Sequence, residues 1–344
     1  MTLSRNMEKL EEIRNEMDKV LNILEKTETE IFALIDDSGE SINPEFIREI
    51  MISDIRQIRD SRTRERAVYY INRFLRNLLE PEFSRVNDIN LSRWKLYSDI
   101  ITDSLWIFKK RDSSGPHNAS YWGNFVPQIP YQLLRRYTKA GDTVIDGFLG
   151  SGTTLIECKR LGRNGIGIEI SSDVANMAME NIAKAGQTGD NFQEIAVGDS
   201  QTYDISGILA SHEVSRAQLI ILHPPYWDII RFGSSQDDLS NAPDESAFLN
   251  MLTKVVNNLS RFLEKNRYLA LVIGDKYSKG TWIPLGFHSM DKVIDSGFTL
   301  KSIVVKNFDV TKGKREQKDL WRYRALKGGF YVFKHEYIFI FQKK

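Results

Sequence analysis

After residue 124, short apolar runs alternate with helix-like segments, and this alternation constrains the fold more than any other feature of the sequence. It predicts an α/β fold, in which helices cover both faces of a largely parallel sheet. No helical segment is evident between the last two runs, so we expect them to form an antiparallel hairpin at one end of the sheet. The expected strands are residues 143–148, 165–170, 194–198, 218–223, 268–274, 300–307 and 331–342.

Residues 1–110 are predicted to be helical throughout. Apolar residues first recur at alternating three- and four-residue steps, a coiled-coil-like stripe that is broken at Arg14 and Glu28. Two interpretations stay open: an amphipathic helix packed on its own domain, or the seam of a homodimer or of a complex with a partner subunit. A second helix is predicted to begin at Pro44, with Asn43 as its cap. The stripe consists of Leu3, Met7, Leu10, Met17, Leu21, Leu24 and Ile31.

A connector rich in Gly, Ser, Pro and Asn, residues 111–124, separates this region from the alternating part. The 344 residues therefore divide into a helical region, 1–110, and an α/β domain, 111–344. The lone cysteine, Cys158, excludes an internal disulfide and a thiolate metal cluster, so we expect no metal and a packing role for its side chain. With no signal peptide or membrane-spanning run evident, the expected location is cytoplasmic.

The first expected strand leads into a glycine-rich turn, residues 147–154, and then into a helix from about residue 151 to 161. Glycine allows close approach of a ligand to the backbone, and a helix N-terminus offers free N–H groups. The second strand ends at Glu169, an acidic residue that can accept both ribose hydroxyls. The third is followed by Asp199, whose carboxylate can reach the amino group of an adenine ring. These positions predict a site for an adenosine-bearing cofactor.

The turn excludes two common nucleotide sites. Leu155 stands where a dinucleotide fingerprint has its third glycine, and Thr153 follows Gly152 where a Walker loop has lysine. The spacing thus leaves the identity of the adenosine cofactor open.

The fourth expected strand runs into His223-Pro224-Pro225-Tyr226. The prolines fix the backbone and lack N–H groups, which leaves carbonyls free to accept hydrogen bonds from a base amino group. Tyr226 offers a flat face for an extruded base. In isolation such a sequence more often marks a rigid turn with an aromatic for the core. Its place after the glycine-rich turn and two acidic residues favours a functional role.

Together these motifs resemble those of the amino-group DNA methyltransferases, which modify adenine N6 or cytosine N4. Residues 146–154 are similar to their D-P-F-x-G-S-G-T-T cofactor motif, and residues 223–226 are an H-P-P-Y variant of their D/N/S-P-P-Y catalytic motif. Residues 335–338 resemble their closing H-E-Y strand. Residues 125–130 resemble the segment that closes over the methionine end of the cofactor. These motifs follow the family's order along residues 117–344. The resemblance implies a seven-stranded Rossmann-like sheet and S-adenosylmethionine as methyl donor.

The resemblance also implies a set of site residues. The catalytic residues would be His223, Pro224, Pro225 and Tyr226. The cofactor-binding residues would be Phe125, Pro127, Asp146, Phe148, Gly150, Ser151, Gly152, Thr153, Glu169, Ile170, Asp199 and Ser200.

Three departures from the family pattern matter. Gly147 replaces the usual proline, which we expect to be a mild change. His223 replaces Asp, Asn or Ser. Because only neutral imidazole accepts a hydrogen bond, we expect activity with a pH dependence that Asp enzymes lack, and the usual cue for adenine against cytosine is weakened. Finally, about two dozen residues separate Asp199 from His223, too few for the target-recognition domain that some members insert there.

Recognition of DNA must then come from elsewhere in the chain. One candidate is the arginine-rich stretch at residues 48–76, because guanidinium groups fit phosphate oxygens; the alternative is a solvated helix face with internal ion pairs. The other is the basic connector at residues 311–327, which contains two aromatic residues; the alternative is a solvated loop. The arginines are Arg48, Arg56, Arg59, Arg62, Arg64, Arg66, Arg73 and Arg76.

The sequence thus predicts an S-adenosylmethionine-dependent DNA methyltransferase, of the kind found in restriction–modification systems. Adenine N6 is expected ahead of cytosine N4. Two alternatives stay open: a tRNA or rRNA base methyltransferase, and a non-catalytic nucleic-acid-binding or assembly subunit with the same fold.

Overall fold

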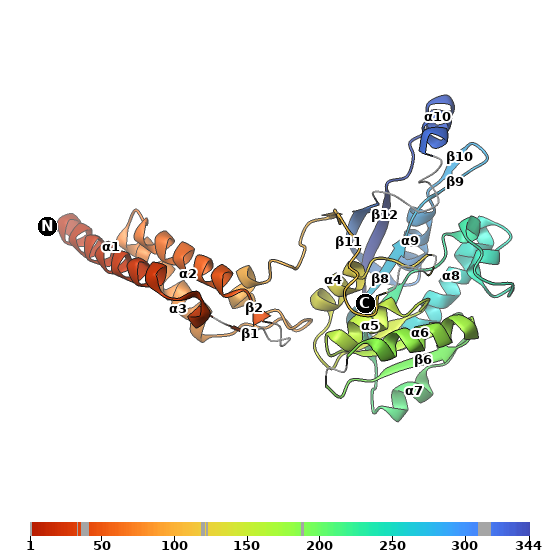
Figure 1. Ribbon diagram of the computed structural model, residues 1–344, viewed down its shortest axis with the longest axis horizontal. Coiled ribbons are helices and arrows are strands. Elements are labelled where there is room, and N and C mark those ends of the chain that lie inside the picture. Colours follow the sequence, from red (N-terminus) through yellow and green to blue (C-terminus); the bar gives the residue numbers. More distant parts are fainter. Residues whose placement is uncertain are drawn as a thin grey trace. The chain divides into compact units, whose positions relative to one another are not determined.

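The computed structural model describes residues 2–32, 34–35, 41–117, 121, 123–186, 189–308 and 318–344. The chain forms two compact units, residues 1–100 and 101–344 (Figure 1). This boundary lies earlier than the one expected at 110/111. The reason is that β3 (Leu105–Trp106) pairs in parallel with β11 (Phe298–Asn307) and so belongs to the sheet of the second unit.

The first unit is built on three helices, α1 (Thr2–Lys26), α2 (Pro44–Arg59) and α3 (Arg64–Leu79), which pack on one another (Figure 1). The predicted start of the second helix is confirmed, since the side chain of Asn43 accepts a hydrogen bond from the Glu45 amide at 2.9 Å and Pro44 is the first helical residue. The remaining elements are short: η1 (Thr29–Phe32), β1 (Leu34–Ile35), β2 (Ser41–Ile42) and η2 (Leu91–Leu96). The strands β1 and β2 form an antiparallel pair between the helices.

The apolar stripe of α1 is used within its own unit. Leu21 is buried with Ile55 and Ile58 of α2, and Met17 and Leu24 pack against this cluster. This contact supports the first of the two interpretations of the stripe, an amphipathic helix packed on its own domain.

The second unit contains an eight-stranded mixed sheet with the order β3-β11-β12-β8-β7-β4-β5-β6. Parallel pairing joins β6, β5, β4, β7 and β8, whereas β12 runs antiparallel to both β8 and β11. The other strands are β4 (Thr143–Asp146), β5 (Asn164–Glu169), β6 (Gln193–Val197), β7 (Ala217–Leu222), β8 (Leu263–Ile273) and β12 (His335–Lys343). All seven expected strands form, and the predicted α/β fold with an antiparallel C-terminal pair is confirmed; β3 extends the sheet by one short strand.

Helices cover this sheet and connect its strands (Figure 1). They are α4 (Gln128–Tyr137), α5 (Thr153–Arg160), α6 (Ser172–Lys184), α7 (Ser206–Ser211), α8 (Glu245–Ser260) and α9 (Leu285–Asp295), with the short turns η3 (Trp227–Ile229) and η4 (Leu239–Asn241). The central strands are fully buried, as at Ile145, Ile220 and Leu271. Cys158 of α5 is buried in this core, in agreement with the packing role expected for it.

The connection between the last two strands differs from the expectation. It contains a helix, α10 (Lys318–Gly328), where no helix was expected, while β11 and β12 pair as predicted. Polar and apolar residues are mixed around α10, with Leu320, Tyr323 and Leu326 exposed, so the sequence shows no helical periodicity there. A hairpin of β9 (Lys276–Ser278) and β10 (Thr281–Ile283) lies near it (Figure 1). Residues 311–317 of the basic connector lie outside the described residues.

Candidate functional site

The glycine-rich turn follows β4 and ends at the N-terminus of α5. Two of its glycines have left-handed backbones, Gly150 with φ +52° and Gly152 with φ +88°. A Cβ on Gly150 would lie 3.1 Å from Cε1 of Tyr121, and one on Gly152 would lie 3.2 Å from Cδ1 of Ile182. Glycine is therefore required at both positions by conformation and by space.

Asp146, the last residue of β4, has one carboxylate oxygen without a hydrogen-bond partner among the described residues. Its Oδ1 accepts from the Phe148 amide at 2.9 Å, whereas no donor among the described residues meets its buried Oδ2 with hydrogen-bond geometry; the Thr154 hydroxyl lies close enough to lower the pKa of this carboxyl. Burial raises the pKa of this carboxyl to about 6. Buried acceptors are nearly always satisfied in proteins, so an unpaired one at a glycine-rich turn fits a ligand that brings a donor, such as the ammonium group of a methionine moiety.

Glu169, the last residue of β5, is bound to the same turn. Its Oε2 accepts from the Gly150 amide at 2.9 Å and its Oε1 from the Ser171 amide at 3.0 Å. Burial raises its pKa. Each carboxylate oxygen has a second lone pair, so Glu169 retains the capacity to accept from ribose hydroxyls. Ile170, which follows, is half-buried.

The segment after β6 lies against the turn as well. The hydroxyl of Ser200 donates to the carbonyl of Gly147 at 2.6 Å. Asp199 Oδ1 accepts from the amide of Gln201 at 2.9 Å, and the Gln201 side chain donates to both Asp199 oxygens at 3.2 Å. The structure therefore brings together the ends of β4, β5 and β6, as expected from their parallel order.

The segment before α4 contacts both the glycine-rich turn and the His-Pro-Pro-Tyr sequence. Thr153 Oγ1 donates to Asn124 Oδ1 at 2.6 Å. The ring of Phe125 meets that of His223 edge to face, with 4.8 Å between centroids. Pro127 is buried immediately before α4. Asn124 thus contacts the glycine-rich turn and Phe125 the HPPY turn, and the cofactor-binding roles expected for Phe125 and Pro127 stay predictions.

Residues 223–226, here called the HPPY turn, follow the carboxyl end of β7. His223 Nε2 lies 3.3 Å from Tyr226 Oη, and Tyr226 Oη donates to Glu336 Oε2 at 2.6 Å. Burial lowers the pKa of His223 to about 4 and raises that of Tyr226. Because β7 lies beside β4 and runs parallel to it, the HPPY turn and the glycine-rich turn are neighbours at the carboxyl end of the sheet.

Three further residues shape this turn, and none was given a role from the sequence. Lys306 of β11 and Glu336 of β12 are cross-strand partners that form an ion pair at 3.1 Å. A Cβ on Gly274, just after β8, would lie 2.8 Å from Cε2 of Tyr226. The family's H-E-Y pattern pointed to residue 336 without giving it a role, whereas the contacts of Lys306 and Gly274 depend on strand register and left no signal in the sequence.

Gly147 has a packing reason in this protein. A Cβ there would lie 2.7 Å from Cδ2 of Leu222 and 2.8 Å from Cδ1 of Leu259. Its amide also donates to the carbonyl of Ile221 at 3.3 Å, which proline cannot do. The space around Gly147 and the hydrogen bond of its amide therefore explain why glycine stands here in place of the usual proline.

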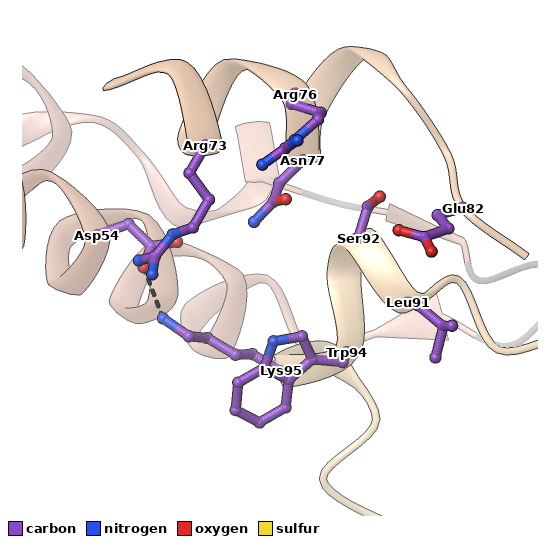
Figure 2. A pocket seen from close by; sticks show the side chains of 9 residues that line it. All are labelled: Asp54, Arg73, Arg76, Asn77, Glu82, Leu91, Ser92, Trp94 and Lys95. Atoms are coloured by element: carbon purple, nitrogen blue, oxygen red, sulfur yellow. Dashed lines mark hydrogen bonds and ion pairs between the residues drawn. The ribbon is translucent and has the colours of Figure 1, made fainter. Parts of the chain in front are cut away.

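The arginine-rich helices of the first unit carry both paired and unpaired arginines. Arg48 pairs with Glu45, Arg56 with Glu25 and Arg59 with Asp60. Among the described residues, none lies within ion-pairing distance of Arg76 at the end of α3, which faces an open cavity of about 330 Å³ (Figure 2). The cavity is lined by Asp54, Arg73, Arg76, Asn77, Glu82, Leu91, Ser92, Trp94 and Lys95.

Figure 2 shows that the residues around this cavity come from α3, from η2 and, at Asp54, from α2, with Glu82 from the segment that joins α3 to η2. Lys95 is paired with Asp54 at 2.5 Å, and the Trp94 ring is 64% exposed. Arg76 and Trp94 line the same cavity from α3 and η2, and guanidinium and aromatic groups on one surface recur where proteins contact nucleic-acid backbone and bases.

The helix α10 is a second basic surface. Arg322, Arg324 and Lys327 are exposed on it, with the Arg324 guanidinium 5.2 Å from the Trp321 ring centroid. Phe330 stacks on Tyr277 with 4.0 Å between ring centroids, and the tilted ring of Phe333 packs on Trp282 with 4.2 Å between centroids. These contacts hold the segment after α10 against the β9–β10 hairpin. The segment after α10 is therefore held by a hairpin that begins two residues after Gly274, the glycine on which the Tyr226 ring packs.

Within the described ranges, no group of three or more His, Cys, Asp or Glu side chains is arranged to hold a metal ion. Within the same part of the chain, no helix has both the length and the apolar character needed to cross a membrane.

Several type II methyltransferases are similar in sequence to part of this chain. Type II methyltransferase M.MjaII from Methanocaldococcus jannaschii is 40% identical over 78 residues, 23% of this chain and 14% of its own length. M.HindIII from Haemophilus influenzae is 32% identical over 110 residues, 31% of this chain and 34% of its own length. M.BsoBI from Geobacillus stearothermophilus is 30% identical over 146 residues, 40% of this chain and 27% of its own length. Each match thus spans about a third or less of the relative.

Among solved structures, a methyltransferase from Pyrococcus furiosus overlaps 66% of this chain and 87% of its own, with a TM-score of 0.41 and 14% sequence identity. A family model described as DNA methylase, of the N6/N4 type, matches residues 42–180 and 217–344. These ranges include the glycine-rich turn, Glu169, the HPPY turn and Glu336. The chain therefore belongs to the N6/N4 DNA methylase family.

Proposed function

We propose that the protein transfers a methyl group from S-adenosylmethionine to the exocyclic amino nitrogen of a base in DNA, with adenine N6 as the target ahead of cytosine N4. One observation carries the proposal. The HPPY turn and the glycine-rich turn follow the neighbouring parallel strands β7 and β4, so they lie next to each other at the carboxyl end of the sheet, close to the buried Asp146 carboxylate. A methyl donor and an acceptor amino group bound at these two turns would be adjacent.

The residues of the glycine-rich side fit the donor. Asp146 Oδ2 offers a buried acceptor for the methionine ammonium, Glu169 offers carboxylate lone pairs for the ribose hydroxyls, and Asp199 offers an acceptor for the adenine amino group. Gly150 and Gly152 leave the backbone open to close approach. Bound there, the donor supplies an electrophilic methyl group on its sulfonium sulfur.

The residues of the HPPY turn fit the acceptor base. The Pro224 carbonyl and neutral His223 accept hydrogen bonds from the two N–H groups of the amino nitrogen, which draws its lone pair out of conjugation with the ring. That lone pair would then form the new N–C bond as the C–S bond of the donor breaks to leave a neutral thioether, and the methylated nitrogen would release one proton to water. Tyr226 provides the face on which the extruded base stacks.

DNA would be held by the two basic surfaces described above. The cavity at Arg76 in the first unit and the exposed face of α10 in the second each combine guanidinium groups with aromatic rings. The named relatives are type II methyltransferases, and we extend this to a role in restriction–modification for the present chain.

The test is transfer of labelled methyl groups from S-adenosylmethionine to duplex DNA, with tRNA and rRNA as parallel substrates, followed by nucleoside analysis by mass spectrometry. We expect N6-methyladenine in DNA. His223→Ala should abolish transfer while calorimetric binding of the donor persists, because His223 contacts the base rather than the donor.

Each contrary result removes a defined part of the proposal. N4-methylcytosine alone would overturn the base assignment and leave the reaction class standing. Methylated RNA with unmethylated DNA would overturn the substrate. Unchanged turnover in His223→Ala would remove the role of the HPPY turn. A chain that binds DNA but no donor would be a non-catalytic subunit.

A further inference from the structure

A continuous chain of polar side chains lies beneath the HPPY turn. Lys306 Nζ is 3.1 Å from Glu336 Oε1, and the other Glu336 oxygen accepts from Tyr226 Oη at 2.6 Å. Tyr226 Oη in turn lies 3.3 Å from His223 Nε2. The ammonium of Lys306 also lies 5.1 Å from the centroid of the Phe308 ring.

Stability alone does not explain the ion pair between Lys306 and Glu336. Lys306 and Glu336 are only 6% and 5% exposed. Removing two charges from water costs several kcal/mol per ion, so that a buried ion pair is often no more stabilising than apolar residues of the same volume. Its position directly beneath the HPPY turn points to a function there.

The hydrogen bonds fix where the protons of this chain lie. A carboxylate has no proton to give, so the Tyr226 hydroxyl donates to Glu336 and keeps only lone pairs for His223. The contact with His223 then requires a proton on Nε2. A neutral imidazole carries a single N–H, which leaves a lone pair on Nδ1. Among the described residues, none is hydrogen-bonded to that nitrogen.

We propose that Lys306 and Glu336 are positioning residues which, acting through the Tyr226 hydroxyl, hold His223 as the neutral Nε2–H tautomer with Nδ1 as the acceptor for the target amino group. The identity of that amino group rests on the proposed function, whereas the state of His223 is a property of the protein alone. Lys306 keeps Glu336 in its charged form, because without the ammonium group Glu336 would be an unpaired buried charge next to the imidazole.

The two charges act on His223 in opposite directions. Glu336 of β12 raises its pKa and Lys306 of β11 lowers it, while burial, the largest effect, brings it to about 4. In the described part of the chain, the His223 ring also meets the hydroxyl and ring of Tyr226 and the uncharged ring of Phe125. Removal of either charge should therefore shift the pKa of His223 in a predictable direction, and the tautomer of its ring reports whether the pair acts through the Tyr226 hydroxyl.

The experiment is an acid titration of the full chain labelled with ¹⁵N-histidine, followed by two-bond ¹H–¹⁵N spectra that separate the two neutral tautomers. The chain has five histidines, so the His223→Gln variant identifies the His223 signals. We expect the Nε2–H form with a depressed pKa in the wild type. Lys306→Met should raise this pKa by about one unit or more. Glu336→Gln should lower it, and Tyr226→Phe should leave a mixture of tautomers.

Lys276→Met is the matched control. Lys276 is 7% exposed and is paired with Asp228, but it is not among the charges that act on His223. We expect the His223 signals of this variant to match those of the wild type.

An Nδ1–H tautomer in the wild type, or an unchanged tautomer in Tyr226→Phe, would overturn the proposal. So would shifts of the same sign in Lys306→Met and Glu336→Gln. Tyr226→Phe removes a single oxygen and leaves the ion pair in place, so it decides the question even where a charge variant fails to fold. Because no donor or DNA is present, the outcome is independent of whether methyl transfer occurs.

Discussion

At the scale of single residues, His223 departs most from its family and defines the pH behaviour of the site. Its pKa is lowered to about 4 by burial, so the imidazole is neutral and able to accept a hydrogen bond throughout the physiological range. We expect the rate of methyl transfer to stay level as pH falls through about 6.5, the ordinary histidine value, and to decline only toward pH 4. A pH–rate profile at saturating donor checks this. A decline centred near the ordinary value would contradict a neutral, buried His223.

Gly152 shows how a single residue shapes the cofactor turn. Gly152→Ala places a side chain at φ +88° and 3.2 Å from Ile182, whereas Gly162→Ala meets the same left-handed strain at φ +72° with nothing within 4 Å. We expect both variants to lose about 1–2 kcal/mol of unfolding free energy from backbone strain, and Gly152→Ala to lose more and to bind the donor weakly. Denaturant unfolding and calorimetry measure the two effects. Equal losses would show that the crowding at Gly152 is without consequence.

At the scale of elements, α3 brings an unpaired arginine to the cavity of the first unit (Figure 2). If Arg76 neutralises a phosphate, Arg76→Ala should weaken DNA binding and reduce the slope of log affinity against log salt by about one. Arg56→Ala is the control, because Arg56 is already paired with Glu25 at 3.0 Å. Binding titrations at several salt concentrations compare the two variants. An equal change in both slopes would mean that the cavity is not a phosphate site.

At the scale of the whole molecule, the proposed donor site lies entirely within residues 101–344. This unit has its own buried core, including Ile145, Leu271 and Phe339. We expect residues 101–344, expressed alone, to fold and to bind S-adenosylmethionine with the affinity of the full chain, but to bind DNA more weakly. Calorimetry with the donor and DNA titrations test this. A folded but donor-free fragment would place part of the donor site in the first unit, whose helices α2 and α3 are also covered by the family match.

The sequence by itself determined the order of elements and the chemistry at their ends. Apolar runs and glycine positions are local properties, so the strands, the glycine-rich turn with Gly150 and Gly152, and the acidic residues Glu169 and Asp199 could be predicted without a structure; the left-handed backbone of the two glycines came from the structure. The parallel order of the strands then implied that these residues lie close together at the carboxyl end of the sheet. Polar and apolar residues are mixed around α10, so its sequence carried no periodic signal and the helix was missed.

Only the tertiary structure decided the contacts between residues far apart in the chain. Lys306 meets Glu336 because β11 and β12 pair in one register, and Glu336 meets Tyr226 because β12 lies beside β8 at the carboxyl end of the sheet. Gly274 is required only because the Tyr226 ring packs on it. The burial that sets the pKa of His223 also comes from several elements at once. Strand register and packing density arise from the whole fold, so no local pattern encodes them.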